Sequence, residues 1–146
     1  MSNEQKDYVV EGFNELNQAF RKGGVNCLPN GWCGTFINEL VRDLYAVLGP
    51  YYASHFVVLD IKEKYGELRL YWDWDEKIFE MNSKEDILDA AHKYDEVEKV
   101  IEKYTKKSIH TCTQCGKQEN VRVDAYVGLP LCEHCATRVQ NDGRCN

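Results

Sequence analysis

The chain has 146 residues, of which 43% are hydrophobic and 29% charged, and its formal net charge at pH 7 is −6. This composition is that of an ordinary globular protein and excludes a disordered chain. The acidic charge is spread over the chain without a visible basic face. It disfavours nucleic acid as the main partner, because lysine and arginine contacts to phosphate carry most of such affinity.

No stretch approaches the ~18 apolar residues of a membrane-spanning helix, and the first six residues are too polar for a secretory signal. Seven cysteines, an odd number, without such a signal favour a reducing compartment. We therefore expect a cytoplasmic protein that makes no membrane contact.

Two helices are predicted in the first third of the chain, over residues 4–20 and 35–48. The glycines at 23–24 end the first helix, and the Gly-Pro pair at 49–50 ends the second. Each helix has apolar residues three or four positions apart, as on the buried face of an amphipathic helix. These inward residues are Val9, Phe13, Leu16 and Phe20 in the first helix, and Ile37, Leu40, Val41, Leu44 and Leu48 in the second.

Residues 55–74 change to a period of two around Tyr65-Gly66, which predicts a β-hairpin with strands 56–63 and 67–74. Apolar residues must oppose apolar residues across the strand pair, because opposite residues share a face. Pairing Lys64 with Glu67 meets this requirement. It sets Ile61 opposite Leu70, Leu59 opposite Trp72 and Val57 opposite Trp74.

The other face of the predicted hairpin is a candidate surface for a partner. The same register places Lys62 beside Arg69 and Asp60 beside Tyr71 on that face. The turn from Lys62 to Arg69 could also be a recognition tip, because its cations would suit a carboxylate or phosphate. The alternative is a solvated face whose charges pair with one another and protect an exposed edge. The candidate partner-binding residues are Lys62, Lys64, Arg69 and Tyr71.

A third helix is predicted over residues 84–104. Ser83 stands at its N-cap with Asp86 three residues on, a capping-box-like arrangement. Its charged outer side is typical of a solvated surface. Its predicted inward residues are Ile87, Ala91, Tyr94, Val97, Ile101 and Tyr104.

The clearest chemical motif is a pair of Cys-x-x-Cys sequences separated by sixteen residues. Two thiolates two residues apart in a tight turn can share one ion, and two such pairs complete a tetrahedral set. An alternating segment over residues 121–127 lies between them and predicts a strand, so the unit is interpreted as a small zinc ribbon. The expected ligands of one structural Zn²⁺ are Cys112, Cys115, Cys132 and Cys135.

The alternative for these cysteines is a pair of redox motifs or disulfides. A thioredoxin-type motif opens a helix after a strand, whereas Gly116, Lys117 and Gln118 indicate a turn here. A site closed by four cysteines leaves no position for water, so the motif argues against a zinc enzyme. His134 inside the second pair is interpreted as a surface residue for the same reason.

Several further groups have weaker patterns. Asp73, Asp75 and Glu76 would suit a cation or paired acids, but also an ordinary hairpin end. The remaining cysteines are spaced poorly for a second metal site with a histidine. The three tryptophans suit the core better than a platform for bases. These cysteines, histidines and tryptophans are Cys27, Cys33, Cys145, His55, His110, Trp32, Trp72 and Trp74.

The order of these motifs resembles a group of small, largely uncharacterised bacterial and phage proteins. The likeness covers roughly residues 31–135: Gly31-Trp32 opening a helix, the string Lys62-Glu-Lys-Tyr-Gly-Glu-Leu-Arg-Leu-Tyr71, and a C-terminal four-cysteine ribbon. The resemblance implies this fold and a metal, and a phage or bacterial source. It implies no activity.

The sequence therefore predicts an α+β fold: amphipathic helices on a β-hairpin over residues 1–107, a zinc ribbon over 108–139 and a polar tail over 140–146. Three classes of function stay open. The first is a zinc-stabilised interaction protein that binds a protein partner, such as a host factor if a phage encodes it. The others are a nucleic-acid-binding regulator that uses the ribbon, and an enzyme whose site the sequence does not reveal. The oligomeric state is not predicted.

Overall fold

The computed structural model describes residues 14–80 and 83–142, and its architecture is α+β, as predicted. Of the first predicted helix, residues 4–13 lie outside the described residues, with Val9 and Phe13 among them. The elements are α1 (Asn14–Gly23), the 3-10 turn η2 (Val25–Cys27), α2 (Asn30–Cys33), α3 (Ile37–Ala53), β1 (Phe56–Lys64), β2 (Glu67–Trp74), the 3-10 turn η3 (Glu76–Glu80), α4 (Lys84–Ile109), β3 (Val121–Val123), β4 (Pro130–Cys132) and α5 (Glu133–Asp142).

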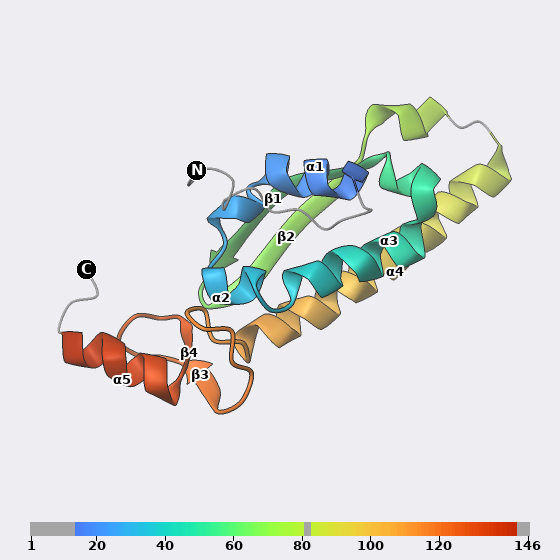
Figure 1. Ribbon diagram of the computed structural model, residues 1–146. Coiled ribbons are helices and arrows are strands. Elements are labelled where there is room, and N and C mark those ends of the chain that lie inside the picture. Colours follow the sequence, from blue (N-terminus) through green and yellow to red (C-terminus); the bar gives the residue numbers. More distant parts are fainter. Residues whose placement is uncertain (1–13, 81–82, 143–146) are drawn as a thin grey trace.

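Three helices cover one face of the β1–β2 hairpin. The helix α1 packs on β1, α4 packs on β2 and on α3, and the short ribbon of β3 and β4 lies at the far end of α4 (Figure 1). The covered face is apolar and the opposite face is open, which is the alternation expected of a half-buried antiparallel pair. The largest fully buried side chains of this core are Trp32, Tyr104, Phe20, Phe36, Leu16, Ile37, Leu40, Leu44, Leu48, Ile61 and Leu68.

The hairpin register is confirmed near its turn and wrong further from it. Ile61 pairs with Leu70 as predicted, but the register then shifts between Val58 and Asp60, so that Val58 faces Trp72. The skipped residue, Leu59, is 62% exposed instead of buried. One extra residue in a strand moves the side chains of all residues before it to the opposite face of the sheet.

The shift exchanges the two faces at the start of β1. Phe56 pairs with Trp74 and is buried, whereas Val57, which was predicted to face Trp74, is exposed. Closer to the turn the pairs Lys62–Arg69 and Asp60–Tyr71 form as predicted.

The long regular part of α3 ends at its Gly-Pro pair, as predicted, but a second short helical segment follows directly. Gly49 has a positive φ of 77° and interrupts the helical backbone, but helical structure resumes after it and continues to Ala53. Pro50 stands in the first turn of this last segment, where its missing N–H costs nothing. Tyr52 and Ala53 are buried there, so packing against the core explains the continuation.

The helix α4 is capped as predicted, since the backbone N–H of Asp86 donates to Ser83 Oγ at 3.0 Å. The predicted inward residues of its second half, Val97, Ile101 and Tyr104, are buried. The prediction for its first half was wrong, because Ile87 is 57% exposed and Tyr94 41%. The reason is the length of α4, whose first turns extend beyond the end of α3 (Figure 1). In the described part of the chain, no helix is long and apolar enough to cross a membrane.

Candidate metal centre

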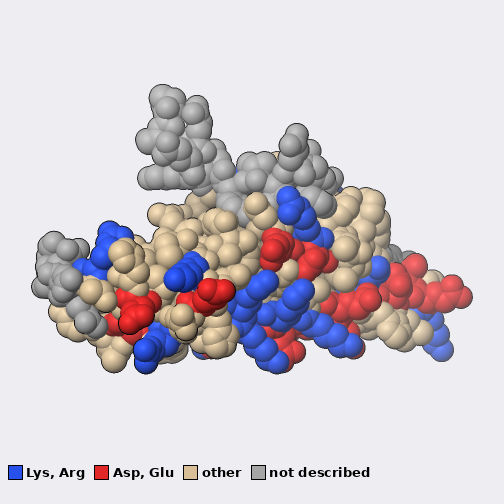
Figure 2. Space-filling model, turned by 60° about the horizontal axis from the view of Figure 1, so that its bottom comes forward, with Lys and Arg blue, Asp and Glu red and all other residues tan. Residues whose placement is uncertain are grey.

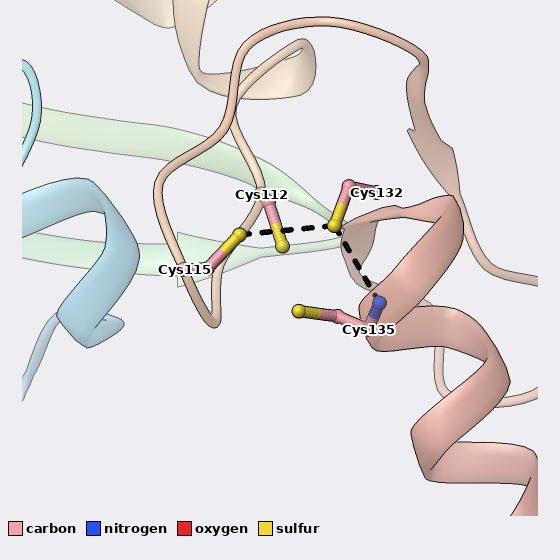
Figure 3. Close-up of side chains that lie close together, drawn as sticks. All are labelled: Cys112, Cys115, Cys132 and Cys135. Carbon is pink, nitrogen blue, oxygen red and sulfur yellow. Dashed lines mark hydrogen bonds between the residues drawn. The ribbon is translucent and has the colours of Figure 1, made fainter.

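The four predicted cysteines converge at the end of the molecule beyond α4 (Figure 3). Cys112 and Cys115 lie in the loop after α4, Cys132 ends β4 and Cys135 lies in the first turn of α5. Their Sγ atoms all lie within 4.8 Å of one another, and Cys115 Sγ is 3.7 Å from Cys132 Sγ. A tetrahedral ion with ~2.3 Å bonds to sulfur requires sulfur separations of about 3.8 Å. The cluster therefore has the size to hold one metal ion.

Local backbone geometry explains how each cysteine reaches the cluster. Gly116 has a φ of 85°, which allows its N–H to donate to Cys112 O at 3.0 Å and close the first turn. The N–H of Cys112 donates to Lys117 O at 2.8 Å. Across the ribbon, the pairing of Val121 with Cys132 and the N–H of Thr113 on Pro130 O bring the second pair of cysteines to the first.

The strand predicted over residues 121–127 is shorter than expected, because it ends at Val123. The buried carboxylate of Asp124 accepts the backbone N–H groups of Tyr126 and Val127, at 2.8 and 3.2 Å. This turn reverses the chain towards β4, and such side-chain bonding competes with a strand. The turn shortens the sheet to three residue pairs.

The electrostatics of the cluster favour a bound cation. Burial raises the pKa of the Cys112 thiol, but the backbone N–H groups of Cys115, Cys132 and Gln114 outweigh it and lower that pKa to about 6. Burial and the neighbouring sulfurs raise the pKa of Cys135. Four thiolates in this space repel one another, so a cation is needed to keep all of them ionised.

The backbone of the loop that carries Cys112 and Cys115 contacts the backbone of α2 directly. The N–H of Gly31 donates to Thr113 O at 2.8 Å, and Trp32 Nε1 donates to Thr111 O at 3.0 Å. The Thr35 hydroxyl lies 2.6 Å from Gly31 O and 3.2 Å from Gly116 O. The cluster is therefore anchored to the helical core by buried hydrogen bonds.

A second contact joins the ribbon region to the hairpin. The backbone N–H of Leu68 donates to Ser108 Oγ, near the end of α4, at 2.9 Å. A Cβ added at Gly66, in the hairpin turn, would lie 3.3 Å from both Gly128 O and a methyl group of Val123. The predicted boundary between residues 107 and 108 stays a prediction, and α4 continues across it to Ile109.

The candidate partner-binding residues lie on the open face of the hairpin, and Lys62 also lines a hollow with Thr113 and Gln114 of the loop that carries Cys112 and Cys115. Lys62 pairs with Asp60 at 3.0 Å, and Arg69 with Glu67 at 3.6 Å. Arg69 Nε is buried and has no hydrogen-bond partner. Lys64 lies over the Tyr65 ring, and Tyr71 is 47% exposed. The structure thus places Lys62, Lys64, Arg69 and Tyr71 on one surface without assigning a ligand to them.

The remaining cysteines and histidines do not form a second metal site among the described residues. In this part of the chain, only the four-cysteine cluster has the geometry to hold a metal ion. Cys27 is exposed, and burial raises the pKa of the Cys33 thiol to about 11. His55 Nδ1 lies 2.8 Å from the Asp75 carboxylate. His110 and His134 are exposed, and Cys145 lies outside the described residues.

The other weak patterns are structural in this fold. Trp32 and Trp72 are buried, and Trp74 packs edge-on against Trp72 with ring centroids 4.8 Å apart. Asp73 Oδ1 accepts the N–H of Trp74, while Asp75 accepts that of Lys77. These contacts account for the three tryptophans and for Asp73 and Asp75.

The residues that anchor the cluster could not be recognised from the sequence. Thr35 and Ser108 carry no chemical motif, and only their contacts identify them. Gly31 and Trp32 are part of the motif order that resembles the bacterial and phage proteins. That motif did not indicate that they contact the loop carrying the cysteines. A scan against protein families and searches of curated proteins and of solved structures found no match to the chain.

Proposed function

We propose that this is a small protein-interaction module whose C-terminal ribbon is stabilised by one structural Zn²⁺. The observation that supports this most strongly is the closed set of four sulfur atoms, anchored to the core through α2. A site of four cysteines uses every position of a tetrahedral ion, so the metal would hold the fold and would not activate water.

The donor set favours zinc over magnesium and calcium. Magnesium and calcium prefer oxygen ligands, whereas four thiolates in a tetrahedral arrangement suit zinc. The ligands of this ion would be Cys112, Cys115, Cys132 and Cys135. A reducing cytoplasm, which we propose as its location, keeps such thiols available.

The proposal of a protein partner is supported by exposed side chains on the open hairpin face. Leu59 is 62% exposed, Tyr65 82% and Tyr71 47%. Two of the cations between them, Lys62 and Arg69, have acidic partners within the hairpin. Aromatic and apolar side chains among paired charges suit a protein surface better than a polyanion. A phage or bacterial origin, with a host factor as partner, is part of the proposal and rests only on the resemblance.

Binding of nucleic acid through the ribbon is the alternative, and the charge distribution opposes it. Figure 2 shows basic and acidic side chains interleaved on one face of the molecule. The lysines near the end of α4 have acidic partners: Lys103 with Asp43, Lys106 with Glu102 and Lys107 with Glu39. Paired cations contribute less to a field that attracts phosphate.

The test of a protein partner is site-specific photo-crosslinking in cells of the encoding organism. A photoreactive residue replaces one exposed tyrosine at a time: Tyr71 on the hairpin, Tyr126 on the ribbon and Tyr94 on α4. A discrete adduct to one protein from at least one of these positions, absent when the exposed Ala46 is replaced, supports the proposal. No such adduct from any of the three contradicts it.

A titration with labelled DNA and RNA of mixed sequence distinguishes the proposed protein-interaction module from a nucleic-acid-binding regulator. We expect weak binding at physiological salt with a shallow salt dependence. Tight, steeply salt-dependent binding that is lost when Lys62, Lys64 and Arg69 become alanine would instead establish the regulator. The matched control removes three exposed cations elsewhere in the chain, Lys22, Lys77 and Lys84.

A further inference from the structure

An apolar groove of about 610 Å³ lies where the end of the hairpin meets the first half of α4. Six apolar residues line it: Trp74 and Ile78 from β2 and η3, and Ile87, Ala90, Ala91 and Tyr94 from α4. A volume of several hundred Å³ with apolar walls is typical of a binding site. The groove lies apart from the cysteine cluster, which is at the other end of α4 (Figure 1).

The walls of the groove are held by specific contacts. The rings of Trp72 and Tyr94 lie 4.7 Å apart, and Trp72 Nε1 donates to Glu98 at 2.6 Å, which joins β2 to α4. The Tyr52 hydroxyl donates to Asp89 at 2.7 Å, which joins α3 to α4. Because these contacts fix α4 against its neighbours, the groove is formed before any partner binds, and a partner would not have to order it.

The net negative charge of the chain is concentrated in the segment that contains all of the residues lining this groove. Residues 73–98 carry ten acidic and three basic side chains, a net charge of −7, whereas the whole chain has −6. Asp95 is the charged residue among the described groove lining. We use the term acidic rim for Asp95 together with the other acidic side chains of residues 73–98. An apolar floor in a segment of this charge is complementary to a partner segment with apolar and basic faces.

Two occupants from this chain fit the charge poorly. Residues 1–13 carry three acidic and one basic side chain, so they add negative charge to an acidic rim. A second copy that met this groove with its own would place two acidic rims against each other, because a two-fold interface uses the same surface twice. Both arrangements place like charges together in partly desolvated surroundings.

We propose that the groove binds a lysine- or arginine-rich amphipathic helix of a protein partner, with the apolar face of that helix on Ile87, Ala91 and Tyr94. This inference rests on the proposed function and assigns it a surface and a partner chemistry. The acidic part of α4, residues 84–98, is about 22 Å long at 1.5 Å per residue, so a helix of about 15 residues matches it. The acidic side chains of the rim then pair with the basic face of the partner.

The test uses a fluorescein-labelled peptide of leucine and lysine, about 15 residues long, with helical amphipathic spacing, titrated by fluorescence anisotropy at physiological salt. A peptide of the same composition but scrambled spacing controls for charge alone. The groove variant is Ile87→Lys and its matched control is Leu88→Lys. Both variants add one positive charge, at neighbouring positions that are 57% and 59% exposed. Only Ile87 lines the groove, so a difference between the variants reports on the groove itself.

We expect the full-length protein and Leu88→Lys to bind the amphipathic peptide with similar affinity. Ile87→Lys and the scrambled peptide should each weaken binding at least about tenfold, as loss of a central apolar contact does. Thermal unfolding of both variants at the wild-type temperature shows that the fold is intact, as expected for exposed positions.

Three results would overturn the inference: no binding of the amphipathic peptide, equal weakening by Ile87→Lys and Leu88→Lys, or a dimer that Ile87→Lys dissociates in ultracentrifugation. The first two exclude the groove as the determinant, and the third assigns it to a second copy. If a discrete crosslinked adduct still forms from Tyr71 or Tyr126, the proposed function stands without this groove.

Discussion

At the scale of single residues, the structure gives Gly31 a role that the motif alone does not explain. A Cβ at this position would lie 2.1 Å from Cys112 O and 2.7 Å from the Thr113 carbonyl carbon. Both obstacles are backbone atoms of the loop that carries the cysteines, so they cannot rotate away as a side chain does. The glycine is therefore required by the close approach of α2 to the metal loop.

Gly31→Ala should lower the free energy of unfolding by about 1–3 kcal/mol, the range for overpacking a close-packed interior. Gly34→Ala is the control, because its added Cβ would lie 3.4 Å from the nearest atom and its backbone is helical. Urea denaturation of both variants measures the difference. Equal stability of the two would contradict the docked arrangement of α2 and the loop.

Tyr104 is a second residue whose role depends on the fold. Its hydroxyl donates to the Asp43 carboxylate, and burial together with this carboxylate raises the pKa of Tyr104. Because the folded pKa lies above the unfolded value of about 10, the unfolded state loses its proton first as the pH rises. The resulting stabilisation is complete below pH about 10 and is lost above it.

Tyr104→Phe should therefore lose less stability than the wild type between pH 9 and 11, although it loses one hydrogen bond, about 1 kcal/mol, at neutral pH. Tyr126→Phe, with an exposed ring, is the control and should follow the wild type. Urea denaturation across this pH range gives the comparison. An equally steep alkaline loss in Tyr104→Phe would rule out the pKa argument.

At the scale of elements, the hairpin shows what periodicity can and cannot predict. The turn and the pairing of Ile61 with Leu70 follow from apolar residues opposing each other. Leu59 could not be placed, because an apolar residue in a bulge looks like one more member of the alternation. The register beyond it is fixed by Phe56 and Trp72, which stack with ring centroids 4.9 Å apart in the core.

Leu68→Ala and Leu59→Ala make the same change at a buried and at a bulged position. Leu68 has no exposed surface, so its truncation should cost about 2–5 kcal/mol of unfolding free energy. Leu59 is 62% exposed, and its truncation should cost less than about 0.5 kcal/mol. Equal costs would restore the unshifted register, in which both leucines are buried.

The helix α4 illustrates a second limit of sequence analysis. Its apolar spacing correctly gives the inward face of Val97, Ile101 and Tyr104, but periodicity does not say how far a covering element extends. The first turns continue beyond α3, so the same stripe becomes one wall of the groove. The acidic charge of the first half of α4 was also not apparent. The lysines of residues 99–107 offset it when the net charge is summed over the whole helix.

At the scale of the whole molecule, the candidate metal centre and the helical core form one connected structure. The four cysteines were predictable from spacing alone, because two close pairs define a tetrahedral set. Their anchoring was not, since it depends on backbone approaches at Gly31 and Gly66 that arise only in the folded chain. If zinc holds the ribbon, its removal should therefore also destabilise α2 and the hairpin turn.

The central claim is that these four cysteines hold one structural zinc ion. Native mass spectrometry of protein purified under reducing conditions tests it with the wild type, Cys115→Ser and the control Cys27→Ser, whose cysteine lies outside the cluster. We predict the added mass of one zinc in the wild type and in Cys27→Ser, and no zinc in Cys115→Ser. Full retention of zinc by Cys115→Ser, or a disulfide between Cys112 and Cys115 in the metal-free wild type, would contradict it.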